Sequence, residues 1–318
     1  MHVAARPRRT RPTVRLAKGR RVTGRGRSLS PHALGLIGLV VTSAGWGLNW
    51  PGMKLLLREW PPLFARGAAG LAAAAILALL AWRVGERLAF PRALLPQLAL
   101  ASFVNVFAWM GFTTLSLRWL TAGQGALLVY TMPIWAMLLA WPVLGRRPSA
   151  RHVAGLALSI AGIVTLFGGD TALGIERLPG VACALGAAFL FALGTIVLKP
   201  LPLPAFAAVA WQLVLGCAPM IVLGLLFEHP DFGALTALGA GLMAYMTIVP
   251  MGVCYLTWFA ALRRLRPETA SMVTLLTPVI GVSTAALFLG EPFGARQVAA
   301  VALTIAGLAL VIRPGSEL

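Results

Sequence analysis

Ten apolar runs follow one another from residue 33 onward, and short breaks rich in charged residues or proline separate them. A helix needs roughly 20 residues to cross about 30 Å of hydrocarbon, so each run predicts a membrane-spanning helix. The alternating pattern of an outer-membrane β-barrel is absent from these runs. The predicted spans are 33–57, 63–82, 94–116, 121–144, 152–168, 178–198, 204–227, 236–261, 269–290 and 296–312.

The second half of this pattern repeats the first. Residues Leu117–Phe167 align without gaps on Leu262–Ile312 at a constant offset of 145. Within them, LGRRPSARHVAGLALSIAG at 144–162 lies over LGEPFGARQVAAVALTIAG at 289–307. One repeat contains five predicted helices, an odd number, so the second repeat enters the membrane from the opposite side. Inverted repeats of this kind are a known basis for alternating access to a site at the membrane midplane.

Composition supports a membrane protein and excludes a soluble one. Hydrophobic residues make up 59% of the chain, charged residues 11%, and the mean hydropathy is +0.84. A soluble domain has about 45–50% apolar and about 25% charged residues, because a folded globule needs polar groups to face water. The expected fold class is therefore an all-α polytopic membrane protein with ten transmembrane helices in two inverted five-helix repeats.

The net charge of +18 predicts orientation rather than nucleic-acid binding. Residues 1–30 hold ten of the 27 Lys and Arg residues and no acid, which indicates a basic, disordered tail. Eleven further basic residues fall in loops on the tail's side of the membrane and five in loops on the other side. Because basic loops stay in the cytoplasm, we expect a multi-pass protein of a bacterial inner membrane with both termini cytoplasmic.

Several kinds of chemistry lack their motifs in this sequence. None of the three lysines follows a glycine, which excludes a Walker motif, and no HExxH or GxSxG pattern occurs. Cys183, Cys217 and Cys254 all lie in apolar runs without a CxxC pair, so neither a disulfide framework nor a thiolate metal site is expected. We therefore predict no catalytic residue, no metal and no cofactor. No Asp or Glu falls at a predicted midplane, so facilitated export or exchange fits as well as proton coupling.

Arg66 is the clearest charge inside a predicted span. Its guanidinium is suited to bind a carboxylate or phosphate of a substrate, or alternatively it snorkels to the outer interface. The offset of 145 places Trp211, followed by Gln212, at the matching position of the second repeat. All three residues are candidates for a substrate-binding cavity.

Further candidates come from polar, aromatic and proline residues within the spans. Asn49 lies in the first span beside Trp46, Trp50 and Pro51, where it either binds substrate or pairs with backbone that the proline frees. Pro51, Pro133 and Pro278 are expected to break or hinge their helices, and the last two are related by the offset. The remaining residues expected either to line the cavity or to lie at the lipid interface are Gln124, Tyr130, Tyr245, Tyr255 and Trp258.

Two other matched features have structural interpretations. Lys54 and Lys199 are related by the offset at the C-terminal ends of their helices, where topology and the helix dipole explain a cation. Small residues four apart indicate close helix packing, either between the repeats or in a homodimer. They are Ala157, Ala161, Ala302 and Ala306.

Several segments together resemble the EamA-type transporters of the drug/metabolite transporter superfamily. They are WGLNWPGMK at 46–54, PPLFARGAAG at 61–70 and AALRRLRPETASMVTLLTPVIGVSTAALFLGEPFGARQ at 260–297. The resemblance implies two EamA-like repeats, at 33–168 and 178–313, and the export or import of small metabolites such as amino acids, drugs or cofactor-like solutes. The first repeat departs from the family pattern, because it has Arg146 where the second has Glu291.

These features lead to one functional hypothesis. The chain is expected to be a secondary active or facilitative transporter that moves a small organic metabolite, an amino acid or drug-like solute, out of the cell by alternating access. The expected partners are this solute and the lipid bilayer, without nucleic acid. A channel-like facilitator is the closer alternative, and a membrane-embedded enzyme is the more distant one.

Overall fold

The computed structural model describes residues 30–145, 147–167, 174–265 and 273–312, and these segments are helical without a strand. Eight helices in them are long and apolar enough to cross a membrane, and two shorter apolar helices bring the set to the ten that the sequence predicts. Four spans are compound: Arg92–Ser116, Ala122–Leu144, Ile175–Val197 and Ala237–Leu262. The main helices are α1 (Pro31–Leu56), α2 (Pro62–Arg83), α3 (Leu95–Ser102), the π-helix η2 (Phe103–Phe112), α4 (Thr113–Ser116), α5 (Ala122–Val129), α6 (Met132–Leu144), α7 (Ala150–Phe167), α8 (Leu178–Val197), α9 (Ala205–Phe227), α10 (Ala237–Ile248), the π-helix η5 (Val249–Val253), α11 (Cys254–Leu262), α13 (Leu276–Leu289) and α14 (Ala295–Ile312).

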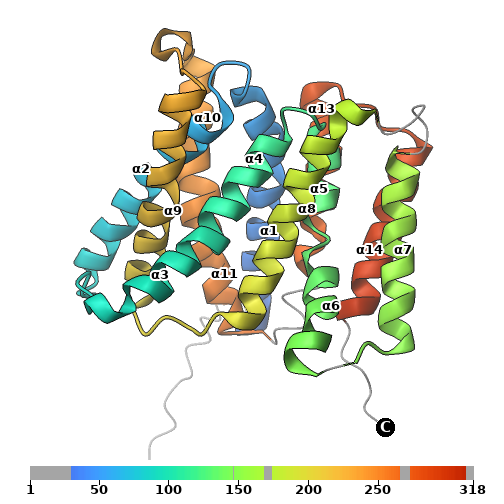
Figure 1. The fold of residues 1–318 in the computed structure, drawn as a ribbon, viewed down its shortest axis with the longest axis horizontal. Coiled ribbons are helices and arrows are strands. Elements are labelled where there is room, and N and C mark those ends of the chain that lie inside the picture. Colours follow the sequence, from blue (N-terminus) through green and yellow to red (C-terminus); the bar gives the residue numbers. More distant parts are fainter. Residues whose placement is uncertain (1–29, 146, 168–173, 266–272, 313–318) are drawn as a thin grey trace, which may run out of the picture.

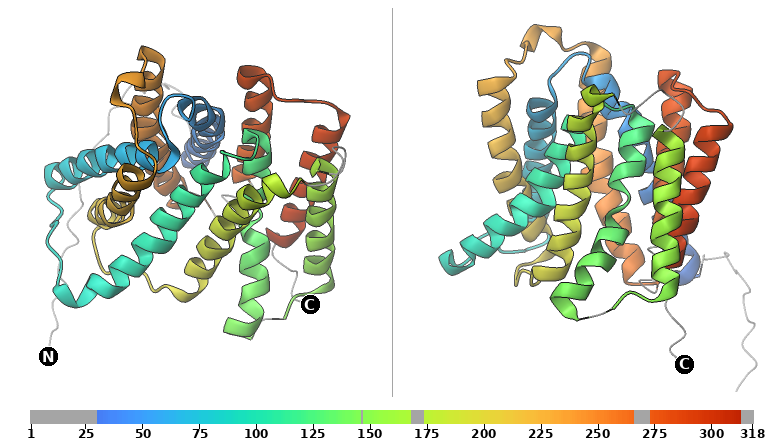
Figure 2. Two further views of the ribbon diagram at one scale, coloured as in Figure 1. Left: turned by 45° about the horizontal axis from the view of Figure 1, so that its top comes forward. Right: turned by 45° about the vertical axis from the view of Figure 1, so that its right-hand side comes forward.

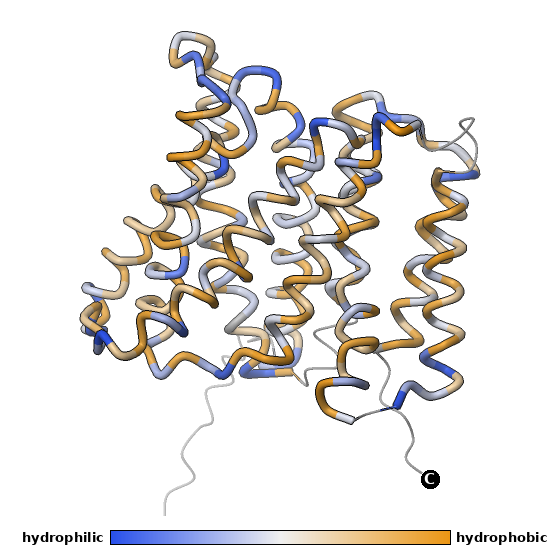
Figure 3. The backbone as a smooth tube through the Cα atoms, viewed as in Figure 1, coloured by the Kyte–Doolittle hydropathy of each residue, from blue (hydrophilic) through white to orange (hydrophobic). Residues whose placement is uncertain are grey.

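The helices form one bundle with two polar ends (Figures 1 and 3). We call the end at which α1 begins the N-terminal face and the end with the α1–α2 loop the opposite face. Large apolar side chains such as Val164, Leu225 and Phe288 are exposed on the sides of the bundle. Such a continuous apolar surface is suited to lipid and not to water.

Helix packing follows the inverted repeat. The two most extensive pairs, α2 with α9 and α7 with α14, each join a helix to its counterpart in the other repeat. The remaining contacts also occur in matched pairs, since α1 packs on α13 just as α8 packs on α6. The bundle is therefore two five-helix units of opposite orientation that interlock, as Figure 2 shows for the side-by-side α7 and α14.

Glycines, and not alanines, bring α7 and α14 together. A methyl group added to Gly162 would lie 2.8 Å from the carbonyl oxygen of Ala300, and one added to Gly155 would lie 2.7 Å from that of Gly307. Ser159 and Thr304, which are related by the offset, meet in this interface through a 3.5 Å hydrogen bond. The expectation that the alanine pairs join the repeats is wrong, because Ala157, Ala161, Ala302 and Ala306 are exposed on the outside of the two helices.

Glutamates hold α2 and α9 to each other at both ends. On the opposite face, the Glu228 carboxylate accepts hydrogen bonds from the backbone amides of Leu63 (3.2 Å) and Phe64 (3.0 Å) at the start of α2. On the N-terminal face, Glu86 accepts one from the amide of Ala207 (3.0 Å) at the start of α9. A negative charge at a helix N-terminus is stabilising, so each helix is capped by a residue that follows its partner.

Helix breaks also occur at matched positions. Tyr130 and Thr131 separate α5 from α6 immediately before Pro133, and a turn at Leu275 precedes α13, which contains Pro278. At Pro51 the expected break does not occur, because α1 runs through the proline without interruption. A proline removes one amide donor, and the neighbouring α13 and α11 pack along α1 and keep it helical.

Candidate functional site

A cavity of about 510 Å³ opens between α8, α9, η2 and α11 toward the N-terminal face. Its polar lining includes Asn105, Thr195, Lys199, Gln212 and Tyr255, and Phe191 adds an aromatic wall. The cavity lies where the α8–α9 loop leaves room between the two repeats, and residues of both repeats line it. Two of the predicted residues, Gln212 and Tyr255, therefore lie together in one cavity.

Two amide side chains meet inside this cavity. The Asn105 Nδ2 donates a 3.0 Å hydrogen bond to Oε1 of Gln212, whose own Nε2 donates to the Ala208 carbonyl at 3.3 Å. Asn105 projects from the π-helix η2 and Gln212 from α9, so the pair bridges the repeats. A polar group of a ligand in the cavity can replace one partner in these hydrogen bonds, so that both amides remain hydrogen-bonded.

Arg66 lies on α2, near its start, and is only 6% exposed. Its Nε and Nη1 have no hydrogen-bond partner in the described part of the chain. The groups that act on its charge are Tyr255, which also lines the cavity, and Cys217. This burial excludes the alternative that Arg66 snorkels to the outer interface. Among the described residues Arg66 is the one buried cation, and no Asp or Glu of these residues is buried.

The burial of Arg66 is unfavourable for folding by itself. A buried charge costs several kcal/mol unless it is paired, and a cation near the N-terminus of α2 is further disfavoured by the helix dipole. An anionic ligand with two oxygens would satisfy Nε and Nη1 together and neutralise the charge. The site is therefore suited to bind a carboxylate or phosphate group.

Aromatic residues surround the Tyr255 side of the site. The Trp46 ring meets Tyr255 edge to face at a centroid distance of 6.0 Å and lies 5.9 Å from Trp258. Trp46 is fixed from the other side, because its indole Nε1 donates to the Pro250 carbonyl at 3.1 Å. Three predicted residues from α1 and α11 thus form one aromatic cluster that positions Tyr255.

Asn49 is a second buried polar group without a partner. It is 7% exposed on α1, one turn from Trp46, and its Oδ1 accepts no hydrogen bond in the described segments. Whether Asn49 pairs with the carbonyl that Pro51 frees stays a prediction, because that contact would be made by Nδ2 and not by Oδ1. An unpaired buried acceptor favours a ligand with a donor group.

Two predicted residues have other roles. Gln124 forms a capping box with Thr121 at the start of α5, by hydrogen bonds of 3.2 and 3.1 Å, and lines only a small cavity of about 170 Å³ at the opposite face. Trp211 donates to the Leu88 carbonyl at 2.7 Å and packs on Phe90, outside the cavity lining. These two side chains are used by local structure, and their placement in the cavity was wrong.

Tyr245 and Tyr130 lie in the packed interior. The Tyr245 hydroxyl donates to the Gly45 carbonyl of α1 at 2.8 Å, and Tyr130 ends α5 at the helix break. Both rings pack against the same buried apolar cluster, which includes Trp50, Met53 and Leu117. Their expected contact with substrate stays a prediction.

Sequence reasoning missed Asn105, Phe191 and Lys199 as parts of the cavity. Asn105 carried the same signal as Asn49, a polar amide within an apolar run, and could have been found by it. Phe191 carried no signal, because one phenylalanine among many apolar residues is uninformative. Lys199 was interpreted from the sequence only as a cation at the C-terminal end of its helix.

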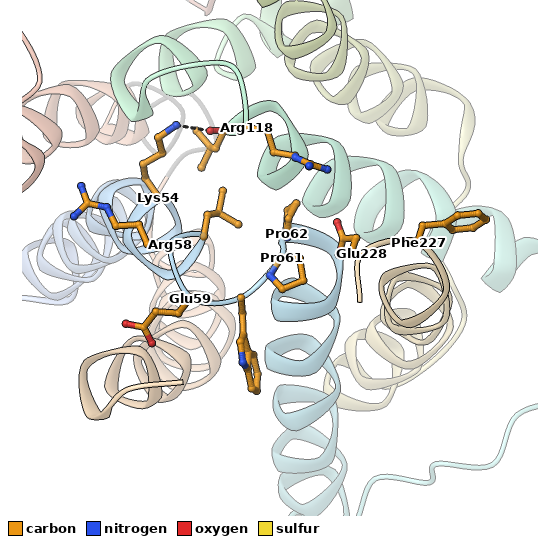
Figure 4. Close-up of a pocket in the computed structure, with 11 residues that line it drawn as sticks. Lys54, Arg58, Glu59, Pro61, Pro62, Arg118, Phe227 and Glu228 are labelled. Atoms are coloured by element: carbon orange, nitrogen blue, oxygen red, sulfur yellow. Dashed lines mark hydrogen bonds between the residues drawn. The ribbon is translucent and has the colours of Figure 1, made fainter. Parts of the chain in front are cut away.

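A second polar cavity, of about 530 Å³, opens at the opposite face (Figure 4). Lys54, Arg58, Arg118, Glu59 and Glu228 line it. The two glutamates already bind backbone amides, Glu228 at α2 and Glu59 at Thr236 (2.8 Å). Below it, the α1–α4 region is packed by fully buried side chains such as Met53, Leu56 and Leu117, which close this end of the bundle.

Comparison with known proteins gives a consistent result. Residues 33–168 and 178–313 each match the sequence profile of the EamA-like transporter family. A "Probable amino-acid metabolite efflux pump" of Salmonella typhimurium is 27% identical over 285 residues, or 86% of this chain and 93% of that protein. A "Probable terminal-alkyne amino-acid exporter" of Streptantibioticus cattleyicolor is 25% identical over 288 residues, or 86% of this chain and 92% of that protein.

The fold also resembles that of a solved protein. A crystal structure superposes with a TM-score of 0.59 at 18% identity, covering 86% of this chain and 95% of that chain. At this identity the likeness supports the fold alone.

Proposed function

The chain belongs to the EamA-like transporter family, and from this premise we propose that it exports a small anionic or zwitterionic metabolite by alternating access. The observation that carries the proposal is Arg66, a buried cation with two unpaired nitrogens, whose charge interacts with Tyr255 in the lining of the cavity. The names of the two relatives suggest an amino acid or a compound derived from one.

The cavity has the size and chemistry for such a solute. Small-molecule sites occupy about 300–1,000 Å³ and combine apolar walls with a few polar groups, and this cavity measures about 510 Å³. In the proposed complex Arg66 binds the carboxylate, the Asn105–Gln212 pair binds a polar substituent, and Tyr255 with Phe191 covers the apolar part. Asn49 offers its free oxygen to an amino group.

Closure at one end supports alternating access over an open channel. The cavity reaches the N-terminal face, whereas buried apolar side chains fill the bundle beneath the opposite face. A channel would need a continuous polar path through that cluster. The inverted repeat supplies a second arrangement, in which the two ends exchange their conformations.

Charge asymmetry supports an orientation in which the open cavity faces the cytoplasm. Basic loops gather on the N-terminal face, which we assign to the cytoplasm together with both termini. The arrangement in the structure then accepts solute from inside the cell. Because no described acid is buried, we propose facilitated export or exchange rather than proton coupling.

The test begins with a comparison of extracellular metabolites from deletion and overexpression strains. The enriched solutes are then tested for counterflow in proteoliposomes that contain the wild type or Arg66→Met. The proposal expects saturable counterflow, with an apparent KM that Arg66→Met raises about 30-fold or more. Single-channel currents would support a channel instead, and chemical conversion of the solute would support an enzyme.

A further inference from the structure

Lys54 joins two elements on the opposite face. Its ammonium leaves the last turn of α1, as Figure 4 shows, and donates hydrogen bonds to the carbonyl oxygens of Leu117 and of Leu120, the latter at 2.8 Å. Of these two bonds, Figure 4 draws only the one to Leu117. These carbonyls lie between α4 and α5, and Leu117 and Leu120 are fully buried. We call this set of hydrogen bonds the Lys54 latch. It ties α1 to the α4–α5 loop at the closed end of the bundle.

The offset of 145 supplies the same parts at the N-terminal face. Lys54 corresponds to Lys199, and the segment Leu117–Leu120, with sequence LRWL, corresponds to Leu262–Leu265, with sequence LRRL. At the N-terminal face Lys199 and the segment Leu262–Leu265 are not joined in this way. Lys199 is exposed, lines the open cavity, and its ammonium makes no hydrogen bond to another described residue. Both lysines thus line a cavity, but only Lys54 is hydrogen-bonded to the carbonyls of its matching segment among the described residues.

We propose that Lys54 and Lys199 are alternating latches of the transport cycle. In the arrangement of the structure Lys54 closes the opposite face. In the alternate arrangement Lys54 releases its carbonyls, while Lys199 donates to those of Leu262 and Leu265 and closes the N-terminal face. This inference rests on the proposed alternating access and assigns its gating to two specific side chains.

The two faces are not equally held. The Glu291 carboxylate accepts hydrogen bonds from the amides of Ala122 (2.6 Å) and Gly123 (3.0 Å) at the start of α5, beside the Lys54 latch. The matching position of the first repeat is Arg146, which lies outside the described residues and carries the opposite charge. The Glu291 contact thus strengthens the closed opposite face, which favours the resting arrangement that opens at the N-terminal face.

The test measures how far each face is open, as a distance between spin labels, without any transported solute. Nitroxide pairs are placed at Arg58 and Arg118 on the opposite face, and in separate samples at their offset partners Leu203 and Arg263, in the full chain with its three cysteines replaced by alanine. Pulsed electron spin resonance then gives the distance distribution for each pair. Lys54→Met, which keeps the side-chain length and removes the donor, is compared with Lys54→Arg, which keeps a cationic donor.

The proposal expects Lys54→Met to lengthen the 58–118 distance and shorten the 203–263 distance. The ratio of the two populations should change about tenfold, as the loss of hydrogen bonds from a charged donor implies. Lys54→Arg should retain the resting distances, and the matched control Lys199→Met should leave them unchanged because its latch is open. Unchanged distances in Lys54→Met, or an equal shift in Lys199→Met, would overturn the proposal.

Two features keep this test independent of a folding defect in Lys54→Met and of the proposed transport. If Lys54→Met does not fold, Lys54→Gln, which keeps a neutral donor, replaces it with the same expected direction. The distances report gating and need no transported solute. Failure of counterflow with intact distance shifts would therefore refute the proposed transport and not the latches.

Discussion

Replacement of Arg66 by methionine should separate the effect on substrate binding from the effect on folding. Methionine fills a similar space, carries no charge and has no hydrogen-bond donor. Because Nε and Nη1 are buried and unpaired without ligand, the substitution removes an unfavourable group from the empty protein. In the loaded protein it removes the partner of the solute's anionic group. The same mutation should therefore stabilise the fold and abolish tight binding.

The two effects have estimable sizes. Truncation of one partner of a buried, hydrogen-bonded charge pair costs about 2–5 kcal/mol, so the apparent KM for counterflow should rise about 30-fold or more. Replacement of buried charged groups by apolar ones of similar volume often stabilises a fold by about 1–4 kcal/mol, so the Tm of the empty protein should rise. Arg66→Lys keeps the charge but loses the two-pronged geometry, and should fall between the wild type and methionine in KM.

The assay pairs counterflow in proteoliposomes with thermal unfolding of the same purified samples. The wild type should gain Tm when the transported solute is added, and Arg66→Met should not. A methionine variant that transports with unchanged KM would refute the assignment of Arg66 to the substrate. A methionine variant that loses both stability and transport would show that Arg66 is a structural residue with a partner in the fold.

Three further substitutions have expected outcomes that follow from the hydrogen bonds and packing contacts described above. Gln212→Leu should raise KM about tenfold, because it leaves Nδ2 of Asn105 unpaired in the cavity, and Gln212→Glu should recover part of the loss in the same counterflow assay. Glu228→Gln should lower the free energy of unfolding by about 1 kcal/mol, measured by denaturant titration, since it removes the negative charge at the start of α2 and keeps an acceptor. Gly162→Val should lower Tm by a larger step, equivalent to about 1–3 kcal/mol, because its side chain meets the backbone of Ala300 and Thr304, whereas Ala161→Val on the exposed side should not.

Hydrophobic runs and the internal repeat were sufficient to predict the fold. Spans of about 20 apolar residues have few alternatives in a membrane, and an offset repeat of five helices implies inversion. The local breaks were less predictable. Pro133 and Pro278 follow helix interruptions, whereas Pro51 lies inside a continuous α1, because tertiary packing and not the proline decides the outcome.

The candidate site was only partly predictable, for a physical reason. Arg66 was found because a buried charge is rare enough to be visible in the sequence alone. Trp211 and Gln124 carried a similar polar signal, but a loop carbonyl and a capping box use their hydrogen bonds. Which polar group is left unpaired depends on neighbours far apart in the chain, and no spacing along the sequence reports this. Lys54 lies in the last turn of α1 as expected, but its two carbonyl acceptors could not be predicted, since they are more than sixty positions away.

The most direct test of alternating access at this cavity is the accessibility of one cysteine from each side of the membrane. Asn105→Cys, in the chain without its native cysteines, is reacted in oriented proteoliposomes with a membrane-impermeant thiol reagent. The account predicts rapid labelling from the N-terminal face and labelling from the opposite face that is at least about tenfold slower. A tenfold ratio corresponds to a free-energy difference of about 1.4 kcal/mol between the arrangements open to each face. Transported solute should raise the slower rate as the protein cycles. Equal rates from both faces without solute would mean a continuous path through the bundle and would contradict the account.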